Sequence, residues 1–196
     1  MSTETIVDSA PVMAPLIDRL RAAVLLGDVD AITARIKDDL ESFIPAEGLR
    51  LPERFRRSKP ESYSRRLLYR DPELGFTALI MTWGPGQRTA LHDHAGIWCV
   101  EGVVEGNMEV TRYELLEELG DDLFRFAEHE RLGADAGSAG ALIPPLEHHV
   151  LGNPSDRVSL TLHVYGGEMS QCAVFEPVGE TRGLYRRRLR NLSYDE

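Results

Sequence analysis

From residue 63 onward the chain divides into nine short segments that are either apolar or alternate between apolar and polar residues. Gly, Pro, Asn and Asp separate these segments, which is typical of β-strands joined by turns. The expected strands lie at residues 65–70, 76–83, 97–104, 107–115, 123–132, 141–145, 159–167, 172–178 and 184–189. So many short strands favour a mainly β protein, built as a closed antiparallel barrel or a jelly roll that encloses a pocket.

A helical pattern precedes the strands. Between residues 10 and 43 apolar side chains recur every three or four positions, and Asp28 is placed to cap a second helix. With 196 residues, of which 42% are hydrophobic, the chain is long enough for one substantial core and short for two. We therefore expect a single domain over residues 1–196, with a helical lead-in at about 10–45 and a β-barrel at about 63–190.

The charge of the chain argues against two classes of partner. Asp and Glu number 32 against 22 Lys and Arg, a formal net charge of -10, so the surface lacks the basic excess that nucleic acids and anionic lipids attract. The N-terminus shows no secretion signal, and no segment is apolar for long enough to span a bilayer. We therefore expect a soluble, cytoplasmic protein without nucleic-acid or membrane partners. Its two cysteines are too few for a disulfide framework.

Histidines mark a candidate metal site. His92 and His94 are two residues apart, so on an extended strand both imidazoles project from one face and can reach one ion. A third imidazole is available from His148 or His149, which follow a pair of prolines. Because adjacent residues on a strand face opposite sides, only one of these two neighbours should reach the pocket. The residues themselves leave open which one it is.

The spacing of these residues resembles the cupin superfamily. Its first motif has a glycine, then His-x-His, then a glutamate ligand and a glycine, and its second motif adds one histidine. The matching residues of the first motif are Gly86, His92, His94 and Gly106. The expected glutamate position falls at Trp98 or Cys99, and Glu101 comes two residues too late. The resemblance implies a cupin-type antiparallel β-barrel from which the usual carboxylate ligand is missing.

With cysteine in place of that glutamate, the sequence resembles the cysteine dioxygenase type I family, whose members are thiol dioxygenases. The segment WGPGQRTALHDH at 83–94 resembles this family's Trp-Gly-x-Gly lead-in to His-Asp-His. Cys99 stands where the family's cysteine can form a thioether cross-link to a tyrosine, and the partner here would be Tyr165. The resemblance covers residues 60 to 178.

The same resemblance implies the metal and its surroundings. The family's third ligand is followed four positions later by asparagine, which matches His149 and Asn153. The implied ligands of an Fe(II) ion are His92, His94 and His149. In the family a hydroxyl residue, a histidine and the tyrosine alternate along one strand, and alternation would place all three in the pocket. The corresponding residues are Thr161, His163 and Tyr165.

The reaction implied by the resemblance joins a small thiol carboxylate and O₂ to give a sulfinic acid. Because the thiolate supplies the electrons, no nicotinamide, flavin or 2-oxoacid is needed. Tyr165 would lie beside the thiolate and the oxygen, held by His163 and Thr161 through hydrogen bonds. L-cysteine is the expected substrate, and the product would then be cysteine sulfinate.

The substrate carboxylate needs an anchor, and the planar guanidinium of arginine binds carboxylates through two hydrogen bonds. Tyr63 and Arg65 match the Tyr-x-Arg of the bacterial, arginine-type members that act on cysteine. In some relatives the arginine lies at a distance from the first histidine that would correspond to Arg66 here, if no gap is allowed before His92. Both arginines are therefore candidates.

Two alternatives stay open. A sibling enzyme could oxidise 3-mercaptopropionate or mercaptosuccinate, and the second carboxylate of the latter could use both adjacent arginines or recruit Arg182. A protein of another class, a metal- or ligand-binding cupin without turnover, could complete a Zn or Ni site with Glu101 or water. Cys172 is interpreted as a packing residue and His129 as a solvated one.

Overall fold

The structure, a computed structural model, describes residues 10–196. The helices α1 (Ala10–Val24) and α2 (Val29–Glu47) come first, followed by the 3₁₀ helix η1 (Glu53–Arg56). The strands are β1 (Ser64–Arg70), β2 (Thr77–Trp83), β3 (Leu91–His92), β4 (Cys99–Glu105), β5 (Asn107–Gly120), β6 (Leu123–Asp135), β7 (Ala139–Leu142), β8 (His149–Gly152), β9 (Ser159–Tyr165), β10 (Gln171–Pro177) and β11 (Leu184–Asn191). The predicted fold class, mainly antiparallel β with a helical N-terminal part, is confirmed.

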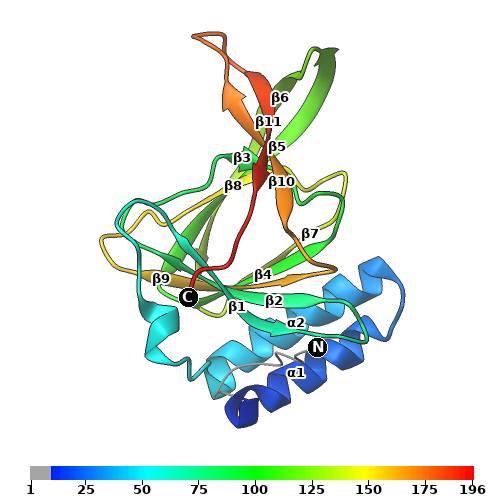
Figure 1. Ribbon diagram of the computed structural model, residues 1–196, viewed down its shortest axis with the longest axis vertical. Helices are drawn as coiled ribbons and strands as arrows, with labels where there is room; N and C mark the ends of the chain where they lie inside the picture. Colours follow the sequence, from blue (N-terminus) through cyan, green and yellow to red (C-terminus); the bar gives the residue numbers. More distant parts are fainter. Residues whose placement is uncertain (1–9) are drawn as a thin grey trace.

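Two antiparallel sheets form the body of the protein. One has the strand order β1-β2-β9-β4-β7, and the other six strands pair in a closed cycle, β10-β11-β6-β5-β8-β3, in which β3 returns to β10. In Figure 1 the first sheet lies between the helices and the second group of strands, whose long hairpins extend away from the helices. Buried side chains of β2, β4 and β9 cluster with those of β10, so the space between the sheets is enclosed.

The helices α1 and α2 cover the outer face of the first sheet (Figure 1). Asp28 caps α2 as predicted, and its carboxylate accepts the backbone N–H of Ala31 at 3.0 Å. The helix lies so close to β4 that a Cβ added to Gly102 would come within 3.2 Å of the side chains of Leu40 and Ile44. Among residues 10–196, no helix has the length and apolar character needed to cross a membrane.

Every predicted strand is present, although the segment expected at 141–145 is shifted to 139–142. The prediction missed β3 and β8, which have two and four residues and are too short to show a period. The expectation that His92 and His94 share one extended strand is wrong, because β3 ends at His92. The chain turns there because the Asp93 carboxylate accepts the backbone N–H groups of Ala95 and Ala173.

The strand β9 separates an apolar face from a polar one. All seven of its residues are buried. The three that pack with the helices are Leu160, Leu162 and Val164. The residues between them, Thr161, His163 and Tyr165, face the interior. The apolar and polar sides of the strand thus follow from the two-residue period of an extended chain.

The register between β4 and β9 brings further polar residues to the interior. Cys99 lies directly opposite Tyr165, and Glu101 lies opposite His163. The turn into β5 depends on Gly106, which has a positive φ of 75°. A Cβ on this glycine would lie 2.4 Å from the Ser159 hydroxyl, so the turn requires glycine.

Candidate metal centre

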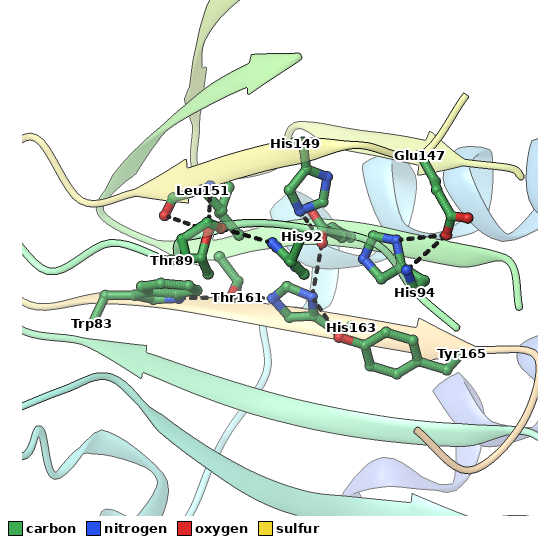
Figure 2. Close-up of polar contacts among 12 residues, drawn as sticks. Trp83, Thr89, His92, His94, Glu147, His149, Leu151, Thr161, His163 and Tyr165 are labelled. Carbon is green, nitrogen blue, oxygen red and sulfur yellow. Dashed lines mark hydrogen bonds and ion pairs between the residues drawn. The ribbon is translucent and has the colours of Figure 1, made fainter. Parts of the chain in front are cut away.

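Three histidines converge in the space between the sheets. His92 ends β3, His94 follows it, and His149 begins β8, where it pairs directly with His92. One ring nitrogen of each lies within 4.8 Å of the others, and the ring centroids are 4.6 to 5.2 Å apart. Figure 2 shows the three imidazoles around one central space. Such a cluster of imidazole nitrogens can hold a metal ion.

The ring nitrogens of two of these histidines are buried without a hydrogen-bond partner. This holds for both nitrogens of His94 and of His149 among residues 10–196, and neither side chain is exposed to solvent. In His92, Nδ1 lies 3.1 Å from the carbonyl oxygen of Ala90, which leaves Nε2 for the cluster. Buried polar atoms without partners are rare in proteins. The free nitrogens therefore fit the coordination of a cation.

Burial also favours the neutral imidazoles that bind metals. Burial, together with His149 and His94, lowers the pKa of His92 well below its ordinary value. Burial lowers the pKa of His149 to about 4. Near neutral pH these side chains therefore need not lose a proton before they coordinate an ion.

The neighbouring His148, which directly precedes β8, points to the opposite side of the chain. Its ring packs against Phe126 and Phe175, at centroid distances of 4.9 and 5.5 Å. Alternation along β8 therefore brings His149 to the cluster and directs His148 into a separate apolar cluster.

A buried carboxylate supports His94. Oε2 of Glu147 accepts the backbone N–H of His94 at 2.7 Å and lies 3.3 Å from its Nδ1 (Figure 2). A carboxylate next to the outer nitrogen of a metal-binding imidazole commonly fixes the orientation of the ring.

A chain of hydrogen bonds runs along the opposite wall of the site. The indole N–H of Trp83 donates to Thr161 Oγ1 at 2.9 Å, and Thr161 Oγ1 lies 2.7 Å from His163 Nε2 (Figure 2). The chain continues to Glu101, whose Oε1 lies 3.1 Å from His163 Nδ1. The Tyr165 hydroxyl is farther from this nitrogen, at 3.4 Å.

The carboxylate of Glu101 lies inside the site and is largely buried, with 11% of the side chain exposed. Burial raises its pKa, but His149 and His163, with the hydrogen bond from His163, lower it further than burial raises it. The pKa therefore lies below its ordinary value, and Glu101 is ionised at neutral pH. Its Oε1 is 3.6 Å from His149 Nε2.

Tyr165 and Cys99 face each other across β9 and β4. Both are buried, and burial raises the pKa of each group well above its ordinary value, so both stay protonated at neutral pH. The Tyr165 ring lies 6.0 Å from that of His94. Cys99 is a free thiol here, and the thioether to Tyr165 stays a prediction.

The cavity beside the histidines contains one of the two candidate arginines. Arg65 lines it together with Tyr63, and its guanidinium donates to the carbonyl oxygens of Ser193 and Met169. Arg66 points to the other side of β1, where it donates to the hydroxyl of Ser64 at 2.5 Å. The structure therefore does not bring Arg66 to the cavity.

Comparison with known proteins agrees with this arrangement. The family model described as cysteine dioxygenase type I matches residues 1–177. The chain belongs to the cysteine dioxygenase type I family. This confirms the resemblance found in the sequence and supports a thiol dioxygenase in general.

Solved structures with a similar fold have a low sequence identity to this chain. A double-stranded β-helix protein from Klebsiella pneumoniae is 17% identical, covers 66% of this chain and 99% of its own, and has a TM-score of 0.47. The protein TT1209 from Thermus thermophilus is 20% identical, with 60% and 94% covered and a TM-score of 0.43. A Cupin 2 conserved barrel domain protein from Salinispora arenicola is 19% identical, with 61% and 88% covered and a TM-score of 0.42.

Sequence reasoning missed three residues of the site. Glu147 and Arg190 were assigned no role, and Glu101 was considered only for a protein without turnover. Glu101 carries a usable signal, because it is two residues after Cys99 and must share its face of β4. Arg190 lines the cavity from β11, but nothing distinguishes it from the other arginines of that strand. Cys172 is buried and also lines the cavity, whereas His129 is exposed.

Proposed function

We propose that the protein is an Fe(II)-dependent thiol dioxygenase that oxidises the thiol of L-cysteine with O₂ to cysteine sulfinate. The observation that carries this proposal is the group of three buried histidines with unpartnered ring nitrogens. Their placement in a member of the cysteine dioxygenase type I family supports iron as the metal. We also propose a cytoplasmic location for this enzyme.

The residues that would hold the iron are His92, His94 and His149. When bound, Fe(II) would bring the thiolate and O₂ together and lower the pKa of the thiol. Glu147 keeps the ring of His94 in place through its contacts with the backbone N–H and Nδ1. The apolar residues around the cluster, among them Leu151 and Val174, limit the access of water.

The carboxylate of the substrate would bind to Arg65, whose guanidinium is buried and fixed by two carbonyl oxygens. Two charge-assisted hydrogen bonds from arginine would set the orientation of the thiol toward the histidines. Tyr165 keeps its proton because of burial, so its hydroxyl can donate a hydrogen bond to an anionic group in the cavity. Thr161 and His163 lie next to it on β9 and fix the polar wall of the site.

One observation favours a second substrate class. Arg190 lines the same cavity as Arg65, which provides a second guanidinium for a second carboxylate. A thiol dicarboxylate such as mercaptosuccinate could use both, whereas 3-mercaptopropionate would need only Arg65. The alternative in which mercaptosuccinate recruits Arg182 is not supported, because this residue lies in a different surface hollow with Tyr113 and Tyr185.

The test is thiol-dependent O₂ uptake by the iron-loaded protein. We expect uptake with L-cysteine, one O₂ consumed per sulfinate formed, and loss of uptake after the iron is removed with a chelator. The same assay with 3-mercaptopropionate and mercaptosuccinate compares the substrate classes. Iron-loaded protein that consumes no O₂ with any of the three thiols would contradict the proposed function.

A further inference from the structure

The segment that follows β11 returns to the first sheet beside Arg65. After β11 ends at Asn191, residues 192–195 run back to β1 (Figure 1). The backbone N–H of Leu192 donates to the carbonyl oxygen of Ser170 at 2.8 Å, and its side chain lines the same cavity as Arg65. We call residues 192–195 the strap. It borders the end of the cavity in which the substrate carboxylate is proposed to bind.

The strap binds the backbone of Arg65 through two hydrogen bonds. The backbone N–H of Asp195 donates to the carbonyl oxygen of Arg65 at 2.7 Å, and Oδ2 of Asp195 accepts the backbone N–H of Arg65 at 2.8 Å. Oδ1 of the same carboxylate pairs with Nζ of Lys59 at 2.6 Å. Because β1 is the edge strand of its sheet, these backbone groups of Arg65 have no neighbouring strand to pair with. Asp195 therefore fixes the backbone from which the arginine side chain extends.

The guanidinium of Arg65 is held by neutral groups only. It donates to the carbonyl oxygens of Ser193 in the strap and of Met169, each at 3.3 Å. The ring of Tyr194 lies 5.7 Å from Cζ of Arg65, within the range of a cation–π contact. Among residues 10–196 no carboxylate forms an ion pair with this guanidinium, although Arg65 is only 7% exposed. The strap thus orients the charge of Arg65 without neutralising it.

The two acids that surround the strap have other partners. Asp195 is bound to the backbone of Arg65 and to a lysine. Glu168 pairs with Arg70 at 2.7 Å and accepts the hydroxyl proton of Tyr194 at 2.6 Å. Buried charges in proteins are usually paired, so the unpaired guanidinium of Arg65 fits an anion that comes from outside the chain. Of its five N–H groups, three remain for that anion.

We propose that the strap positions Arg65 for the carboxylate of the substrate. Asp195 sets the backbone of Arg65, and the Ser193 carbonyl oxygen and the Tyr194 ring set the direction of its guanidinium. Tyr194 and Asp195 do not line the cavity, so they act through Arg65 and are positioning residues. This inference rests on the carboxylate binding of the proposed function, but it requires only that the substrate binds and not that it is oxidised.

The experiment is anaerobic calorimetry of the iron-loaded protein with L-cysteine and with 2-aminoethanethiol, which lacks the carboxylate. Asp195→Ala should raise the Kd of L-cysteine about tenfold, because it removes a charge-assisted hydrogen bond to Arg65. Tyr194→Leu should raise it about threefold, and Tyr194→Phe, which keeps the ring, should behave as wild type. The Kd of 2-aminoethanethiol should stay unchanged in all three variants. Glu176→Ala is the matched control, since it breaks an ion pair with Arg188 outside the cavity and should leave both Kd values unchanged.

A double variant separates positioning from a general structural role. In an Arg65→Ala background, Asp195→Ala should cause no further loss of L-cysteine affinity, because the strap acts through Arg65. An unchanged Kd of L-cysteine in Asp195→Ala, an equal loss of affinity for both thiols, or full additivity with Arg65→Ala would overturn the proposal. Binding is measured without O₂, so a wild-type protein that binds L-cysteine but does not oxidise it would contradict the proposed function while the variants still decide the role of the strap.

Discussion

The two faces of β9 carry different kinds of side chain within a single strand. Leu162 packs against the helices on the outer face, while its neighbour His163 belongs to the hydrogen-bond chain on the inner face. On the outer face any well-packed apolar side chain of the right volume suffices. On the inner face each of the polar side chains contacts a specific polar atom of another residue. Neighbouring residues should therefore differ in what their loss affects, stability on one side and chemistry on the other.

The largest contrast is expected at the start of β8, between its first residue His149 and the preceding His148. His149→Ala should abolish stoichiometric iron binding, because it removes one of three imidazoles from the cluster. His148→Ala should keep the iron and lower stability slightly through lost packing with Phe126 and Phe175. Iron content after anaerobic reconstitution measures the difference. Retained iron in His149→Ala, or its loss in His148→Ala, would reverse the assignment of the two faces.

A contrast of intermediate size is expected on β9, between Tyr165 and Leu162. Tyr165→Phe should lower kcat by about 10²-fold while the free energy of unfolding changes little, since only a hydroxyl is lost. Leu162→Ala should lower the free energy of unfolding by about 3 kcal/mol, because it empties space under the helices. Folded Leu162→Ala should keep its kcat. Steady-state O₂ uptake and urea unfolding of both variants test this, and a large kcat loss in Leu162→Ala would contradict it.

The smallest contrast is expected on β1, between Arg65 and Arg66. Arg65→Lys should raise KM for L-cysteine by about tenfold, because lysine cannot reproduce the planar two-point contact with a carboxylate. Arg66→Lys should leave KM unchanged, since its guanidinium bonds Ser64 outside the cavity. The comparison requires KM at saturating O₂ for both variants. An equal rise in KM in both variants would contradict the assignment of the substrate carboxylate to Arg65.

The parts of the site that lie on long, regular strands could be predicted from the sequence. The alternation of Thr161, His163 and Tyr165 was sufficient to place all three on the inner face of β9. The chemistry assigned to them came from the family resemblance, and most of their roles stay proposals. The fold class was also predictable, because eight of the strands have seven or more residues and are long enough to show a period.

The remaining features depend on contacts between distant segments. His94 reaches the cluster from beyond the end of β3, where the Asp93 carboxylate accepts the backbone N–H of Ala173 on β10. Glu147 meets His94 across 53 positions of sequence, and no local pattern connects the two. Arg190 lies in a run of arginines that is typical of a solvent-exposed strand. Only the pairing of β11 with β10 brings it to the cavity. Such placements follow from tertiary packing and not from periodicity.

The register between β4 and β9 also makes thiol oxidation a test of correct folding. Cys99 opposite Tyr165 and Glu101 opposite His163 depend on the same set of strand pairs. A slip by one residue would turn the apolar face of one strand into the interior and carry its polar groups under the helices. A chain paired in this way could still be compact and keep its three histidines, but it would lack the polar wall beside them. The activity per bound metal ion is therefore a measure of how many chains have paired these two strands correctly.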